Sequence, residues 1–108
     1  MAMNRDSKVY LSGPITGIPD YKKKFKEKQK ELWRQGFGWV VNPAEVNSHM
    51  PFGMTHAQYM DMSYAMMSTC DTIILMKGWK ASEGCRAEEA YARAHGMEVV
   101  YEDMERSW

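Results

Sequence analysis

Hydrophobic residues along this chain occur in two patterns that alternate from the N-terminus to the C-terminus. Short apolar runs bounded by Gly, Pro, Asn or Ser are typical of strands. Between them lie longer stretches in which apolar residues recur every three or four positions, as on one face of a helix. A stretch rich in Pro, Gly and Asn at about residues 43–53 predicts a loop. The predicted strands are residues 8–11, 39–41, 71–76 and 98–101, and the predicted helices are residues 21–36, 55–69 and 83–95.

This alternation predicts an α/β fold built as a single domain over residues 1–108. Helical crossovers between successive strands make the sheet parallel, with right-handed connections. Residues 71–76 are nearly all apolar, as expected of a strand buried on both faces. We therefore expect a flavodoxin-like (Rossmann-like) three-layer α/β/α arrangement, with a four- or five-stranded parallel sheet in the order 2-1-3-4.

Composition excludes several classes of protein. Lys and Arg number 14 against 14 Asp and Glu, so the zero net charge gives no electrostatic basis for binding a nucleic acid polymer. No apolar run approaches the roughly 20 residues of a membrane span, and the N-terminus lacks a signal-peptide core. Cys70 and Cys85 form no C-x-x-C pair, and the histidines have no metal-ligand spacing. We expect a cytoplasmic protein that contacts no membrane.

Two turns with glycines and hydroxyls follow the first and third predicted strands, at residues 12–17 and 78–84. In the order 2-1-3-4 these strands are neighbours, so both turns flank one crevice at the carboxyl edge of the sheet. The second turn leads into a helix whose N-terminus favours negative charge. Glu88, one turn inside that helix, can direct its carboxylate over the sheet edge. This combination indicates chemistry on a sugar phosphate.

Each candidate residue also has a structural explanation. Glu88 can stabilise the helix dipole, and Ser82 can cap the helix N-terminus. Tyr10 can be an aromatic residue of the core, and Asp61 can be a surface charge on a helix. The residues alone leave these alternatives open.

Four motifs occur in order between residues 8 and 101. They are Val9-Tyr10-Leu11-Ser12-Gly13-Pro14-Ile15-Thr16-Gly17, Cys70-Asp71 before an apolar strand, Gly78-Trp79, and Ser82-x-Gly84-x-x-x-Glu88. Together they resemble the nucleoside 2-deoxyribosyltransferase-like superfamily, and most closely its small, often phage-encoded branch of unknown function. The enzymatic relatives are nucleoside 2-deoxyribosyltransferases and 2'-deoxynucleoside 5'-monophosphate N-glycosidases.

The resemblance implies an enzyme that hydrolyses the N-glycosidic bond of a nucleoside 5'-monophosphate or nucleoside, or transfers its (deoxy)ribosyl group, without a metal or organic cofactor. In the relatives, the glutamate at the Glu88 position forms a covalent glycosyl-enzyme, and the tyrosine at the Tyr10 position holds it. Ser82 matches the serine of the monophosphate hydrolases, which favours a 5'-phosphate. The implied sugar-phosphate site is lined by Ser12, Gly13, Pro14, Ile15, Thr16, Gly17, Ser82 and Gly84.

The chain departs from these relatives at two positions. Ser63 stands where they have an aspartate on the second helix, so Asp61 is the nearest carboxylate for acid–base work. Thr16 stands where the monophosphate hydrolases carry an arginine. Two alternatives therefore stay open: a non-catalytic nucleotide-binding protein of the same fold, and a protein that binds a partner through its Met-rich second helix.

The resemblance also implies a homo-oligomer, a dimer or higher, in which a neighbouring subunit completes each site. The second helix adds a physical reason, because its apolar residues extend further round the helix than one buried face requires. These residues are Tyr59, Met60, Met62, Tyr64, Met66 and Met67.

Overall fold

The computed structural model describes residues 3–103, which contain a four-stranded parallel sheet in the order β2-β1-β3-β4. Tyr10 in the centre of the sheet pairs with Val41 on one side and Ile73 on the other. The predicted fold class and strand order are thus confirmed. The strands are β1 (Lys8–Ser12), β2 (Trp39–Val41), β3 (Thr72–Leu75) and β4 (Glu98–Tyr101).

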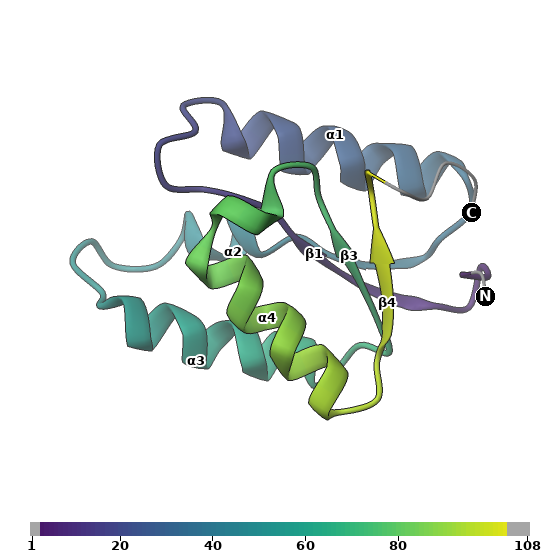
Figure 1. The fold of residues 1–108 in the computed structure, drawn as a ribbon. Helices are drawn as coiled ribbons and strands as arrows, with labels where there is room; N and C mark the ends of the chain where they lie inside the picture. The colour runs from purple at the N-terminus through teal and green to yellow at the C-terminus, as the bar shows by residue number, and fades with distance from the viewer. Residues whose placement is uncertain (1–2, 104–108) are drawn as a thin grey trace.

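Helices cover both faces of the sheet (Figure 1). The first face packs against α1 (Tyr21–Arg34), and the second against α3 (His56–Met67) and α4 (Glu83–Ala94). A short 3-10 helix, η1 (Trp79–Ala81), lies between β3 and α4. The three layers follow the predicted flavodoxin-like arrangement. No helix within residues 3–103 is long and apolar enough to cross a membrane.

Alternate residues of the central strands divide the core into two parts, because successive side chains of a strand point to opposite faces. Leu11 and Ile74 pack with Phe25 of α1. Tyr10 and Ile73 belong to the second part, toward α3 and α4. All five of these side chains are at most 1% exposed. The central strands therefore read as continuous apolar runs in the sequence, since both of their faces are covered.

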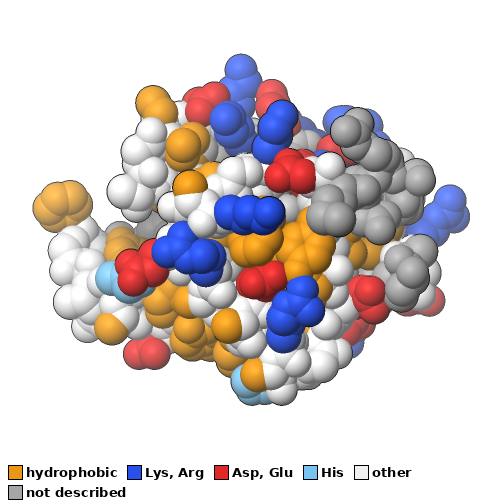
Figure 2. All heavy atoms as spheres, viewed as in Figure 1, with side chains coloured by type: hydrophobic (Ala, Val, Ile, Leu, Met, Phe, Trp, Pro, Cys, Tyr) orange, Lys and Arg blue, Asp and Glu red, His pale blue; other side chains and the backbone are white. Residues whose placement is uncertain are grey.

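Apolar and charged side chains are unevenly distributed over the surface. Figure 2 shows basic and acidic side chains mixed over α1 at the top, whereas hydrophobic side chains gather at the lower left, over α3. On α3, Met67 is buried, and Met60, Met62 and Met66 are half-buried. The oligomer expected from this helix stays a prediction.

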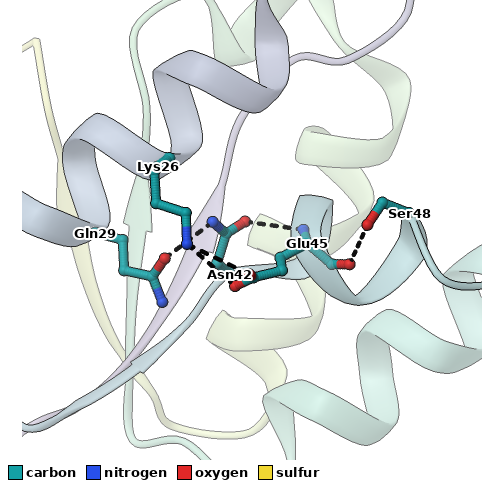
Figure 3. Close-up of polar contacts among 5 residues, drawn as sticks. All are labelled: Lys26, Gln29, Asn42, Glu45 and Ser48. Carbon is teal, nitrogen blue, oxygen red and sulfur yellow. Dashed lines mark hydrogen bonds and ion pairs between the residues drawn. The ribbon is translucent and has the colours of Figure 1, made fainter.

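The prediction of a loop at residues 43–53 is wrong for residues 43–47, because α2 (Pro43–Asn47) forms there. The Asn42 side chain accepts a hydrogen bond from the Glu45 N–H at 3.3 Å and so caps the helix (Figure 3). Pro43 takes the first helical position, where its missing N–H costs nothing. Lys26 of α1 pairs with Glu45 at 3.3 Å, which ties α2 to α1.

Replacing Asn42 by alanine should destabilise the protein by about 1–3 kcal/mol in urea unfolding. The change removes the helix cap and also the donor that reaches Gln29 Oε1 at 3.2 Å in the interior. Ser48→Ala is the matched control, since that exposed hydroxyl donates only to the Glu45 carbonyl. An equal loss of stability in both variants would contradict the role given to Asn42.

Candidate active site

The site begins where α4 starts. The Ser82 hydroxyl accepts from the Cys85 N–H at 3.2 Å and caps the helix, as the alternative explanation of Ser82 expected. Cys85, Glu88 and Ala92 then follow at spacings of three and four residues, which places all three on the buried face of α4. Glu88 is a carboxylate in an apolar layer, and its side chain is directed at the sheet.

Two hydroxyl groups of β1 hold the Glu88 carboxylate. Tyr10 donates from its phenol to Glu88 Oε2 at 2.7 Å, and Ser12 donates to Oε1 at 2.6 Å. Tyr10 and Ser12 are two residues apart on one strand, so their side chains leave the same face of the sheet. Each carboxylate oxygen therefore has its own donor, and the carboxylate is fixed in both position and rotation. Glu88 is only 7% exposed.

Burial governs the electrostatics of this cluster. It raises the pKa of Glu88 above its ordinary value, although hydrogen bonds from Ser12, Tyr10 and Ser63 act in the opposite direction. It also raises the pKa of Tyr10 well above its ordinary value, and the charge of Glu88 adds to that effect. Tyr10 therefore stays a protonated donor. The groups that act to lower the pKa of Glu88 are the hydroxyls of Ser12, Tyr10 and Ser63.

Ser63 lies beside the carboxylate, and Asp61 does not. Ser63 is buried on α3, one turn before the fully buried Met67, and its side chain acts to lower the pKa of both Tyr10 and Glu88. Asp61 is exposed, because residues two apart on a helix do not share a face. The spacing of four between Ser63 and Met67 is a sequence signal for the buried position of Ser63, but the contact with Glu88 needs the fold.

A groove of about 1120 Å³ opens at the carboxyl edge of the sheet, between α1 and the turns after β1 and β3. Five residues of the predicted substrate site line it, namely Pro14, Ile15, Thr16, Ser82 and Gly84. Tyr10, Ser12 and Glu88 are not among the lining residues. The carboxylate lies one turn of α4 beyond Gly84, buried between helix and sheet.

The part of the chain that matches a known family includes the turns after β1 and β3, and it also includes Tyr10, Ser63 and Glu88. The match covers residues 7–101, and the family is described as a domain of unknown function, DUF4406. The chain belongs to the DUF4406 family. No curated protein matches it.

Two of the three predicted glycines of this DUF4406 domain, Gly13 and Gly17, lie outside the groove lining. A Cβ atom on Gly13 would lie 2.9 Å from Met76 Sδ and 3.1 Å from Phe25 Cζ, so the glycine allows the core to pack against the turn. Gly17 has a φ of +79° and no neighbour within 4 Å of an added Cβ, so its requirement is conformational. The structure thus gives both glycines a place in the backbone of the turn.

Residues 3–103 of the DUF4406 domain contain no cluster of three or more His, Cys, Asp or Glu side chains that fits a metal ion. Cys70 and Cys85 are both free thiols. Burial raises the pKa of the Cys85 thiol, which keeps it protonated beside Glu88. The Glu88 carboxylate is therefore surrounded by a protonated thiol and two hydroxyl donors.

Proposed function

We propose that this DUF4406 protein cleaves or exchanges the N-glycosidic bond of a nucleoside 5'-monophosphate or nucleoside. The observation that carries the proposal is the buried Glu88 carboxylate, which receives one hydroxyl donor on each oxygen from Tyr10 and Ser12. The resemblance of its motifs to the nucleoside 2-deoxyribosyltransferase-like superfamily supports the same role for Glu88.

In the proposed reaction, one oxygen of Glu88 attacks the anomeric carbon of the sugar. The C–N bond breaks, and its electron pair leaves with the base, which takes up a proton. Water or a second base then attacks the same carbon and releases the carboxylate, so the anomeric configuration is retained. Tyr10 and Ser12 would keep the carboxylate aligned, since each holds one of its oxygens.

The start of α4 is suited to the phosphate of such a substrate. Ser82 and Gly84 line the groove there, and the free N–H groups of a helix N-terminus attract an anion. The oxygen of Ser82 accepts from the Cys85 N–H, which leaves the hydroxyl proton for donation to a ligand. Thr16 adds a second hydroxyl on the groove wall.

One observation favours a second candidate, a nucleotide-binding protein without turnover. A retaining glycosidase has a second carboxyl group about 5–5.5 Å from its nucleophile. The buried polar residue of α3 that acts on the pKa of Glu88 is Ser63, which stands where the enzymatic relatives carry an aspartate. Such a site can hold a sugar phosphate, but a serine hydroxyl at this position is a much weaker acid than a carboxyl group for protonating the departing base.

Incubation with a panel of nucleosides and their 5'-monophosphates separates these candidates. We expect free base by chromatography, with monophosphates preferred over the matched nucleosides because of the phosphate contacts. A second base added to the reaction is incorporated by a transferase and ignored by a hydrolase. Thermal stabilisation by a nucleotide without base release supports the binding protein. If neither base release nor thermal stabilisation by a nucleotide is observed, the remaining alternative is a protein that binds a partner through α3.

A further inference from the structure

A second polar arrangement at the groove already holds an anion, which is a side chain of the protein itself. Glu102, the first residue after β4, accepts from the Lys77 backbone N–H at 2.7 Å through Oε1. Its other oxygen, Oε2, pairs with Lys28 Nζ at 2.6 Å. All three residues line the groove. Two donors from different elements therefore grip the two oxygens of one carboxylate.

Lys28 is unusually well fixed for a lysine, because its side chain is only 9% exposed. Burial alone lowers the pKa of this amine, but hydrogen bonds to Glu102 and Glu31 outweigh burial and raise it. The ammonium on α1 is therefore charged and held in one position. Glu102 is more exposed, at 24%, so it can turn toward water with less disturbance than Lys28.

The second donor comes from the backbone at the end of a central strand. Lys77 follows β3 by two residues, at the carboxyl edge where parallel sheets bind ligands. Gly78 follows with a φ of +89°, a left-handed conformation that turns the chain away directly after this amide. The position of the Lys77 N–H therefore depends on the strand and the glycine, and Glu102 is not needed to form it.

We propose that Lys28 and the Lys77 amide form an anion subsite of the groove, which Glu102 fills in this structure and which takes a phosphate monoester when Glu102 turns away. Two phosphate oxygens fit the two donors that now hold the two carboxylate oxygens. Lys24 and Arg34 line the same groove and add positive charge to it, whereas Glu27, Glu31 and Glu83 add negative charge. This subsite is independent of the proposed reaction, because Glu88 takes no part in it.

Removing the carboxylate tests the subsite. Glu102→Ala should bind inorganic phosphate at least about tenfold more tightly than the unmodified protein, since the like charge at the subsite is gone. The readout is the thermal midpoint across a phosphate titration, against sodium chloride at equal ionic strength. Lys28→Met in the Glu102→Ala protein should remove the gain. No gain in Glu102→Ala would overturn the proposal and leave Glu102 as a structural clamp.

Glu31→Ala is the matched control. Glu31 also pairs with Lys28, at 3.0 Å, and its loss changes the net charge equally without uncovering the Lys77 amide. An equal gain in Glu31→Ala and Glu102→Ala would refute a defined subsite and indicate a general charge effect. If Glu102→Ala does not fold, Glu102→Gln replaces it, and a Glu102→Gln protein with no tighter phosphate binding also refutes the subsite.

Two further arms identify the source of the phosphate. If a nucleoside 5'-monophosphate binds Glu102→Ala more tightly than inorganic phosphate does, while the matched nucleoside does not bind, the subsite recognises a nucleotide. Equal affinity for the monophosphate and inorganic phosphate assigns it to free phosphate. The gain should persist in a Glu88→Gln background, which separates failure of the subsite from failure of the proposed reaction.

Discussion

Replacement of Glu88 by glutamine is expected to reduce base release by at least about 10³-fold, as loss of a covalent nucleophile does in other enzymes. The amide is too weak a nucleophile to form the glycosyl ester, yet it has nearly the shape of the carboxylate. In the unmodified protein Tyr10 and Ser12 each donate to one carboxylate oxygen. In the variant the amide oxygen can still accept a hydrogen bond from one of them. The measurement is the single-turnover rate of base release from the best substrate of the panel.

Glu89→Gln provides the control from the next position of the same helix. Glu89 accepts from the Tyr101 phenol at 2.5 Å and pairs with Arg93 at 3.4 Å, away from the Glu88 cluster. Its replacement should leave the rate of base release unchanged. If Glu88→Gln retained the rate of the unmodified protein, Glu88 would not be the nucleophile.

The raised pKa of Glu88 gives activity and stability opposite responses to pH. Its pKa is higher in the folded protein than the ordinary value of 4.5, so folding favours the protonated acid. The contribution of Glu88 to the free energy of unfolding is fully present when the pH is below the ordinary pKa, and it is lost as the pH rises through the raised pKa of the folded protein. Base release requires the carboxylate and should therefore increase over that same interval.

The raised pKa of Glu88 also predicts the stability of the Glu88→Gln variant at neutral pH. An ionised Glu88 is held in a buried position that disfavours its charge, and glutamine removes that charge. The thermal midpoint of Glu88→Gln at pH 7 should therefore equal or exceed that of the unmodified protein. A large fall in the midpoint would mean that the carboxylate serves to hold α4 on the sheet.

Replacement of Phe25 by alanine should cost about 3–5 kcal/mol of unfolding free energy, the range measured for large buried aromatic residues. Phe25 is 1% exposed and packs with Leu11 and Ile74 beneath α1. Its ring also lies against Gly13, so the cavity would open directly under the turn that follows β1. Guanidinium unfolding measures the change.

Phe52→Ala makes the same substitution at a fully exposed phenylalanine in the loop between α2 and α3. The free energy of unfolding should change by less than about 0.5 kcal/mol there. Equal losses in the two variants would contradict the packing of α1 against the sheet.

The fold was predictable because its signals are local and repeated. Trp39–Val41 and Glu98–Tyr101 have the bounds that their apolar runs predict, and α4 ends within one residue of its prediction. The helix α2 was missed because Asn42-Pro43 has two opposite uses. The same dipeptide interrupts a strand and starts a helix, as cap and first residue. Only the contact with Glu45 distinguishes the two.

The candidate site was predictable in part. The motifs singled out Glu88 and Tyr10, and the period of two along β1 places Ser12 on the face of Tyr10. The contacts of Ser63 with that pair depend on how α3 packs, which local patterns do not encode. The ion pair of Lys28 with Glu102 joins the first helix to the residue that follows the last strand, and neither residue belongs to a recognised motif.

The central position of β1 has a consequence for how the protein is made. β1 leaves the ribosome before the other strands of this sheet, yet its partner β3 is synthesised about sixty residues later, since Val9 pairs with Thr72. A nascent chain that ends before residue 72 carries Tyr10 on a strand with one edge unpaired and no α4 to cover it. Such non-local pairing slows folding and exposes strand edges in the meantime. We therefore expect the Glu88 cluster to assemble only after synthesis of most of the chain.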